Sequence, residues 1–289
     1  MRRWRDAAGR SMQLVAGSPE LWLPGALAWT ASVGWIPFVV AFARPPSVAE
    51  LTFLGARIVT SGAWPLNAIV IGAAVLAVVL LAFVATAAAN AVLVALLARR
   101  APSVSDVRRM LAVNLVAALP AAIVTFVVLV ALIGVAPREF NAPEPAGGPV
   151  LRTAIRLVPL LLALVLAVAA GSAVAAVAGR LAVDRRVVQA RALRSAPRML
   201  VRPPRAVHAL ISFAAQLVYL GFAALLLRVL WAPIGAQLSV VGEFDVATGF
   251  LLVGFVAIWL CLVLAGGALQ AWSAATWSRL LATDASEGT

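Results

Sequence analysis

The sequence contains few of the residue types on which enzymes and disulfide-bonded proteins depend. Among 289 residues there is one tyrosine, one histidine (His208), one cysteine (Cys261) and no lysine. A single cysteine excludes an intrachain disulfide. A single histidine, with no cysteine or second histidine at ligand spacing, does not make a metal site. We therefore expect neither a disulfide framework nor any metal or other cofactor.

Catalytic motifs are missing too. The chain has neither a phosphate-binding glycine loop nor the G-x-S-x-G turn of a serine nucleophile. His208 stands among arginines at the start of an apolar stretch, where we expect it to be solvated. Coupled transporters usually carry intramembrane carboxylates or unwound helices, and no Asp or Glu falls within the apolar stretches. The sequence thus predicts a protein that is not an enzyme.

Apolar residues, by contrast, dominate the chain. They make up 64% of it, charged residues only 12%, and the mean hydropathy is +1.04. Ordinary soluble domains are about half apolar and about a quarter charged. Because a soluble fold could not bury so much apolar surface, the surrounding solvent must be lipid. The composition predicts an all-α integral membrane protein.

Six apolar stretches are long enough to cross a bilayer. We expect helical spans over about 21–43, 66–98, 110–135, 153–179, 207–231 and 249–278. The first stretch is too long for a secretory signal, so we expect it to stay uncleaved. The domain plan is a basic amphipathic helix over 1–20, a six-helix transmembrane domain over 21–278 and a disordered cytoplasmic tail over 279–289.

The arginines alternate along the chain in a way that predicts topology. Segments 1–20, 99–109, 180–206 and 279–289 contain 17 of the 23 basic residues. This asymmetry is typical of a protein of the bacterial inner membrane with both termini in the cytoplasm. Arg156 and Arg228 near the outer ends are expected to extend outward into water. The net charge of +12 comes without a basic-aromatic module, so no nucleic-acid partner is expected.

One basic segment carries a family resemblance. The stretch DRRVVQARALRSAPRML, residues 184–200, leads directly into the fifth span of a six-span chain. It resembles the membrane domain that precedes some bacterial glycerophosphodiester phosphodiesterases, and is similar to related six-span families of unassigned function. The catalytic domain of those enzymes has no counterpart here. The resemblance implies a six-helix membrane domain and no active-site residue.

The basic segments before the first, third and fifth spans resemble one another. Seven residues separate the pair Arg10-Ser11 from Pro19, and seven separate the pair Arg194-Ser195 from Pro203. The segment 103–112 has a similar character before the third span. One interpretation is that the chain consists of three units, each a basic helix followed by a two-span hairpin. The alternative is that the match between these segments is due to chance.

Small residues recur every fourth position in the fourth span. They are Ala163, Ala167, Gly171, Ala175 and Gly179. Such a stripe forms a shallow groove that admits another helix backbone. The groove serves either packing within the chain or a homodimer seam. We expect this span to be the central and most buried helix.

Polar side chains form a second pattern at one depth of the membrane. Asn90, Asn114, Ser172, Gln216 and Gln270 all fall in the predicted inner leaflet. Unpaired amides are costly in hydrocarbon, so they should face one another or water. They either make hydrogen bonds between helices or line a cavity open to the cytoplasm.

The basic segment before the fifth span offers a surface for lipid headgroups. Its candidate residues are Arg185, Arg186, Arg191, Arg194 and Arg198. Arginines at this spacing suit a helix that lies on an anionic leaflet, which Pro197 should end. The alternatives are that these charges only fix the topology, or that a partner protein docks there.

Taken together, these patterns favour a non-enzymatic polytopic membrane protein. We expect it to pack with itself or with a membrane protein partner and to contact anionic membrane lipids through its cytoplasmic arginines. The alternative is a transporter or permease component with a polar path through the inner-leaflet amides. A polar cavity lined by those amides would favour the alternative, and a close-packed interior would favour the first interpretation.

Overall fold

The computed structural model describes residues 2–43, 50, 53, 57, 60–140, 148–240 and 246–286, without the side chains of residues 140, 239, 240 and 283–286. No strand occurs among them. Six helical segments are long and apolar enough to cross a membrane: Pro19–Phe42, Leu66–Leu97, Val104–Glu139, Pro149–Val183, Pro203–Leu238 and Val246–Ala282. The prediction of an all-α protein with six spans is confirmed.

The first span is a broken helix rather than the continuous one expected over 21–43. After α1 (Arg2–Ala16) come a 3-10 turn (η1, Pro19–Leu21), α2 (Trp22–Trp29), a π-helical turn (η2, Thr30–Gly34) and α3 (Trp35–Phe42). The π turn lies where Gly34 contacts the indole ring of Trp29, and a side chain at Gly34 would overlap that ring. The break thus accommodates one large, fully buried aromatic side chain.

The second span matches the expected 66–98 closely, and the third to sixth spans are longer than expected. These spans are α5 (Leu66–Leu97), α6 (Val104–Phe140), α7 (Pro149–Val183), α9 (Pro203–Val240) and α10 (Val246–Ser286), with the short α8 (Gln189–Leu200) between α7 and α9. Helices of this length reach about 50 Å or more, beyond a hydrocarbon core of about 30 Å, so they tilt or project into the headgroups.

Three boundary predictions are wrong. α8 continues through Pro197 to Leu200, although we expected the proline to end it. α10 remains helical to Ser286, so the tail expected to be disordered is helical over 279–286. α6 runs through Pro137 into the segment expected to be a loop. Residues 44–49 and 141–147, which belong to two predicted outer loops, lie outside the described residues.

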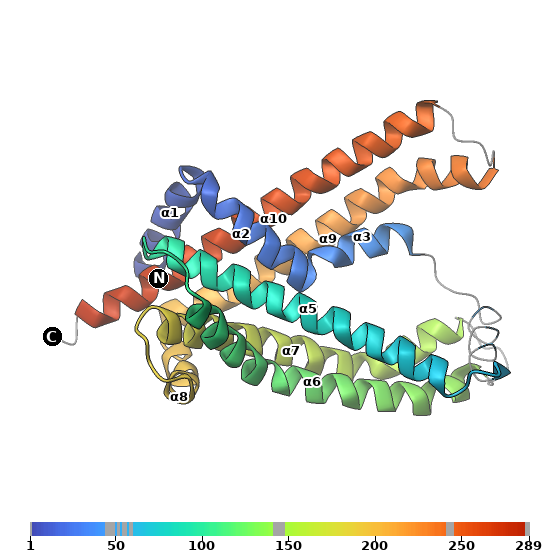
Figure 1. Ribbon diagram of the computed structural model, residues 1–289, viewed down its shortest axis with the longest axis horizontal. Helices are drawn as coiled ribbons and strands as arrows, with labels where there is room; N and C mark the ends of the chain where they lie inside the picture. The colour runs from blue at the N-terminus through green and yellow to red at the C-terminus, as the bar shows by residue number, and fades with distance from the viewer. Residues whose placement is uncertain are drawn as a thin grey trace.

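The helices converge at one end of the molecule. Figure 1 shows α1, α8, the turn between α5 and α6 and the C-terminal end of α10 together on the left, whereas the α9–α10 hairpin and the α5–α7 group diverge toward the right. We call the converging end, formed by α1, α8 and the 98–103 turn, the basic end. The buried clusters around Val113 and Val177, around Leu93 and Ala271 and around Ala87 and Val94 join α5, α6, α7, α8 and α10. A separate cluster around Leu227 and Phe255 joins α3, α9 and α10.

Burial does not follow the small-residue stripe. The most apolar window of the first span is 39% buried, against 6% for α7. The expectation that the fourth span is the most buried helix is therefore wrong. Its outer half carries exposed side chains such as Leu162 and Leu166, because α7 packs chiefly on α6 and α8 and leaves one side open.

Glycines allow a close approach of the backbones of α2 and α10. A Cβ atom at Gly25 would overlap the carbonyl oxygen of Gly267, and a Cβ at Gly267 would lie 2.5 Å from the backbone nitrogen of Ala26. Ala271 and Ala275 continue this face of α10 and are fully or almost fully buried. These small residues of α10 therefore allow its backbone to contact that of α2.

A capping box begins α6. The backbone N–H of Asp106 donates to Ser103 Oγ at 3.3 Å, and the backbone N–H of Ser103 donates to Asp106 Oδ2 at 3.0 Å. Each side chain therefore satisfies the other residue's N–H at the start of the helix.

We predict that Gly25→Ala destabilises the protein by about 1–3 kcal/mol, because the added methyl group overlaps a backbone atom of α10 that cannot move independently. The matched control is Gly254→Ala, since a Cβ at Gly254 meets nothing within 4 Å. Reversible unfolding in mixed micelles measures both. Equal effects of the two substitutions would contradict the crossing.

Candidate functional site

Three of the predicted inner-leaflet amides form one hydrogen-bonded chain. Gln216 Nε2 on α9 donates to Gln270 Oε1 on α10 at 2.8 Å, and Gln270 Nε2 donates to Asn90 Oδ1 on α5 at 3.4 Å. Asn90 Nδ2 in turn donates to the Thr86 carbonyl at 3.0 Å. These hydrogen bonds therefore join three spans, and the three amides bond mainly to one another.

The other two members of the predicted polar cluster lie apart from this chain. Ser172 is exposed on α7 and donates to the Ala169 carbonyl of its own helix at 2.9 Å. Asn114 on α6 is half-buried, and its side chain makes no hydrogen bond to the described residues. The structure thus brings together Asn90, Gln216 and Gln270 but neither Asn114 nor Ser172.

The groove on α7 is occupied by α6. A Cβ at Gly171 would lie 2.6 Å from the Ala117 carbonyl oxygen, and one at Gly179 would lie 2.6 Å from the sulfur of Met110. The two glycines of the stripe therefore serve packing within the chain. Gly179 is buried, and the other members of the stripe are half-buried: Ala163, Ala167, Gly171 and Ala175.

The predicted lipid-contact arginines all lie on the exterior of the basic end. Arg185 and Arg186 follow α7, and Arg191, Arg194 and Arg198 project from α8; all five are exposed. The opposite face of α8 is formed by Ala192 and Ala196, which are fully buried against the bundle. α8 is thus amphipathic, and it directs its charges away from the protein.

The basic end also contains an arginine that sequence reasoning missed. Arg180, in the last turn of α7, is only 7% exposed. Its Nη1 donates to the Ala176 carbonyl at 2.7 Å, its Nη2 to the Ala274 carbonyl of α10 at 2.9 Å, and its Nε to Ser278 Oγ at 3.3 Å. All three acceptors are neutral, and no carboxylate among the described residues forms an ion pair with it.

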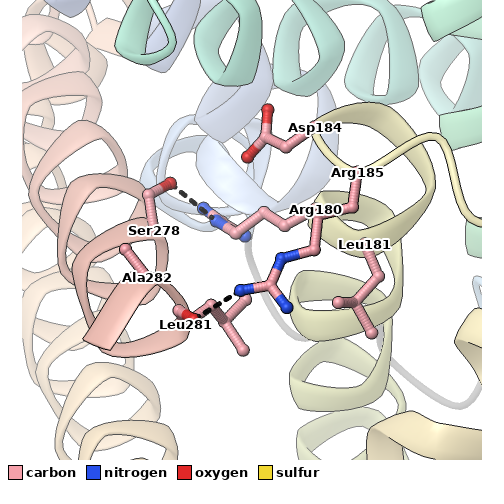
Figure 2. Close-up of a pocket in the computed structure, with 7 residues that line it drawn as sticks. All are labelled: Arg180, Leu181, Asp184, Arg185, Ser278, Leu281 and Ala282. Atoms are coloured by element: carbon pink, nitrogen blue, oxygen red, sulfur yellow. Dashed lines mark hydrogen bonds between the residues drawn. The ribbon is translucent and has the colours of Figure 1, made fainter. Parts of the chain in front are cut away.

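A cavity of about 160 Å³ lies beside this guanidinium, between the ends of α7 and α10. Its lining residues are Arg180, Leu181, Asp184, Arg185, Ser278, Leu281 and Ala282. Figure 2 shows both guanidinium groups extending from the α7 side toward α10, with the Asp184 carboxylate beside Arg180. Arg185 Nη2 crosses to donate to the Leu281 carbonyl at 2.7 Å.

Charge in this cavity is predominantly positive. Arg180 and Arg185 are opposed by Asp184 alone among the lining residues. Partial burial raises the pKa of the Asp184 carboxyl, and the Arg180 and Arg100 guanidinium groups act in the opposite direction. Protonation of Asp184 would make the cavity more positive still.

Two further arginines hold the end of α7. Arg100 Nη2 donates to the Val183 carbonyl at 3.3 Å, and Arg109 Nη1 donates to the Ala182 carbonyl at 3.2 Å. Arg100 also forms an ion pair with Asp106 at 2.6 Å, and this hydrogen bond raises the pKa of the Arg100 guanidinium. The contacts with α7 satisfy carbonyls that a helix end otherwise leaves unpaired.

The single histidine is fully buried, so the expectation that it is solvated is wrong. His208 Nε2 lies 3.2 Å from the Ser273 carbonyl, and Trp4 Nε1 donates to its Nδ1 at 3.5 Å. The rings of Trp272 and Trp277 contact it edge-on. An imidazole that accepts at Nδ1 and donates at Nε2 is neutral and satisfied, which gives His208 a structural role in docking α1.

The arginines near the opposite end also bind protein groups. Glu139 is 4% exposed and pairs with Arg152 Nε at 3.0 Å and with Arg156 Nε at 2.6 Å. Arg228 Nη1 donates to the Ala43 carbonyl at 2.8 Å, beyond the end of α3. Arg156 and Arg228 are both exposed, and each also joins two segments of the protein.

No group of three metal-binding side chains occurs among the residues that the structure describes. Comparison of the chain with protein-family models, with curated proteins and with solved structures gave no match. The resemblance of residues 184–200 to phosphodiesterase membrane domains stays a prediction. The geometry of the basic end is therefore the basis for any functional argument.

We predict that Gln270→Leu lowers the free energy of unfolding by about 1–2 kcal/mol, because Gln216 and Asn90 both lose their partner in the membrane interior. Asn114→Leu serves as the control, since no hydrogen bond to the described residues is lost there. Unfolding in mixed micelles, combined with a Gln216→Leu double-mutant cycle, gives the coupling energy. Additive effects of Gln216→Leu and Gln270→Leu would contradict the hydrogen-bonded chain.

Proposed function

We propose that this chain is a non-enzymatic protein of the bacterial cytoplasmic membrane, with its basic end in the cytoplasm, where it binds anionic lipid headgroups. The observation that carries the proposal is the geometry of α8. Its buried alanine face fixes it to the bundle, and its three arginines remain exposed. A helix held in this way presents positive charge to a negative leaflet without inserting into it.

Convergence of the helices supports the same proposal. α1, α8 and the C-terminal end of α10 lie at the basic end (Figure 1), as an even number of crossings requires. Most of the arginines gather there, as they do on the cytoplasmic side of membrane proteins. The outer halves of α5, α6 and α7 expose apolar side chains that suit lipid tails, a second copy or a partner helix.

The alternative proposal, a solute path through the inner-leaflet amides, has less support. Gln216, Gln270 and Asn90 donate to one another and to a helix carbonyl. Amides engaged in this way offer fewer groups to a passing solute. The cavity of the basic end lies instead beside Arg180 and involves none of these amides.

Orientation can be tested with single cysteines in a Cys261→Ser background. We predict that a cysteine replacing Ala236, exposed near the end of α9, reacts with a membrane-impermeant maleimide on intact cells. One replacing Ser195 on α8 should react only after permeabilisation. Ala142, another predicted outer position, lies outside the described residues. Labelling of Ser195→Cys in intact cells would overturn the proposed orientation.

Lipid binding can be tested by replacing the three α8 arginines with glutamine (R191Q, R194Q and R198Q together). We expect retention of phosphatidylglycerol relative to phosphatidylcholine, measured by native mass spectrometry, to fall about tenfold or more, because each surface arginine contributes about 1 kcal/mol. Arg138→Gln, an exposed arginine at the opposite end, is the control. Unchanged lipid selectivity in the triple variant would rule out this function for α8.

A further inference from the structure

The Arg180 guanidinium is a buried cation without a counter-ion in direct contact among the described residues. Its three hydrogen bonds go to two carbonyls and a hydroxyl, and none goes to a carboxylate. A guanidinium does not lose its proton in proteins, and a buried charge without a partner is strongly destabilising. Glu139 at the opposite end shows the contrast, because it is similarly buried but pairs with two arginines.

The cavity beside Arg180 offers hydrogen-bond donors and space for such a counter-ion. Three of the five guanidinium N–H groups are used by the protein, so two remain. The Ser278 hydroxyl donates to the Ala274 carbonyl and accepts from Arg180 Nε, which fixes the guanidinium plane. Arg185 adds a second guanidinium on the same side (Figure 2). A volume of about 160 Å³ exceeds what one water molecule needs.

We propose that this cavity binds a phosphate group, with Arg180 as the buried charge at its base and Arg185 as a second donor at its rim. Two guanidinium groups at one site suit the oxygens of phosphate, which accept several charge-assisted hydrogen bonds. The phosphate comes either from a lipid headgroup or from free phosphate. Only the first source rests on the proposed function, because a lipid headgroup reaches the cavity when the basic end faces the anionic leaflet.

Removing the charge of Asp184 should strengthen phosphate binding. Its carboxylate lines the cavity beside Arg180 (Figure 2) and repels a bound phosphate. Asp184→Asn keeps the size of the side chain and removes the charge. If the cavity binds phosphate, this variant binds it several-fold more tightly. If Asp184→Asn shows no saturable phosphate binding and only loses stability, that result contradicts the proposal.

The experiment measures binding to the full chain from two sources. Inorganic phosphate is titrated calorimetrically in neutral detergent, and phosphatidylglycerol is followed by native mass spectrometry after reconstitution in phosphatidylcholine nanodiscs. We expect one saturable equivalent from at least one source. Arg180→Gln should weaken it about tenfold to a hundredfold, as expected for the loss of hydrogen bonds to a charged group.

A second variant keeps the test valid if Arg180→Gln does not fold. Ala282 is exposed at the rim, so Ala282→Phe places a ring in the cavity and leaves the Arg180 side chain itself unchanged. Ala190→Phe places the same ring on an exposed site of α8 outside the cavity and is its control. We expect binding to be lost in Ala282→Phe and kept in Ala190→Phe, with equal thermal stability.

The outcomes separate this site from the α8 surface. Saturable binding that survives the R191Q, R194Q and R198Q replacements but not Ala282→Phe supports the cavity, even if the proposed lipid selectivity of α8 fails. Binding of inorganic phosphate alone identifies free phosphate as the source, and binding of the lipid alone identifies the headgroup. No saturable binding from either source, or equal loss in Ala282→Phe and Ala190→Phe, would overturn the proposal.

Discussion

The fold depends on arginine side chains that satisfy main-chain carbonyls where the helices converge. Arg100, Arg109 and Arg180 donate to carbonyls near the end of α7, and Arg185 donates to α10. The Val183 and Ala182 carbonyls that Arg100 and Arg109 bind lie in the last turn of α7, where a helix leaves carbonyls unpaired, and burying them unpaired near a membrane is costly. Long cationic side chains can reach from one helix to the next, and their charge favours the negative end of the helix dipole. The arginines from which the topology is predicted therefore also hold the helices together.

A second set of contacts joins the helices at small residues and at amides. In lipid, apolar side chains gain nothing from leaving the solvent, so spans associate through close backbone approach and hydrogen bonds. The structure follows this rule closely. Gly25 and Gly267 allow α2 to meet α10, and the Gln216–Gln270–Asn90 chain joins α9, α10 and α5. Beyond these points the α5–α7 group and the α9–α10 hairpin separate (Figure 1), and their exposed apolar faces suit lipid.

Periodicity and composition were enough to predict the local features of the fold. Six spans and an amphipathic α8 depend on local residue patterns, and the structure has both. The sequence could not predict which polar groups meet, because that depends on how helices far apart in the chain are arranged. Asn114 and Gln216 both lie in the predicted inner leaflet, yet only Gln216 faces the amides of its neighbours. Depth alone does not specify the direction in which a side chain points.

The arginines also show what the sequence could not predict, because this one residue type has three different environments in the structure. Arg194 is exposed on α8, Arg156 pairs with the buried Glu139, and Arg180 is itself buried. All three flank apolar stretches, so composition alone does not distinguish them. What distinguishes Arg180 is the pattern around it. It occupies the last turn of a helix whose small residues, including Gly179, let α6 approach, and Ser278 of α10 lies opposite. Arg180 is buried because the end of α7 also meets α10, where the Ala274 carbonyl and the Ser278 hydroxyl accept from its guanidinium, and the sequence alone does not indicate that meeting.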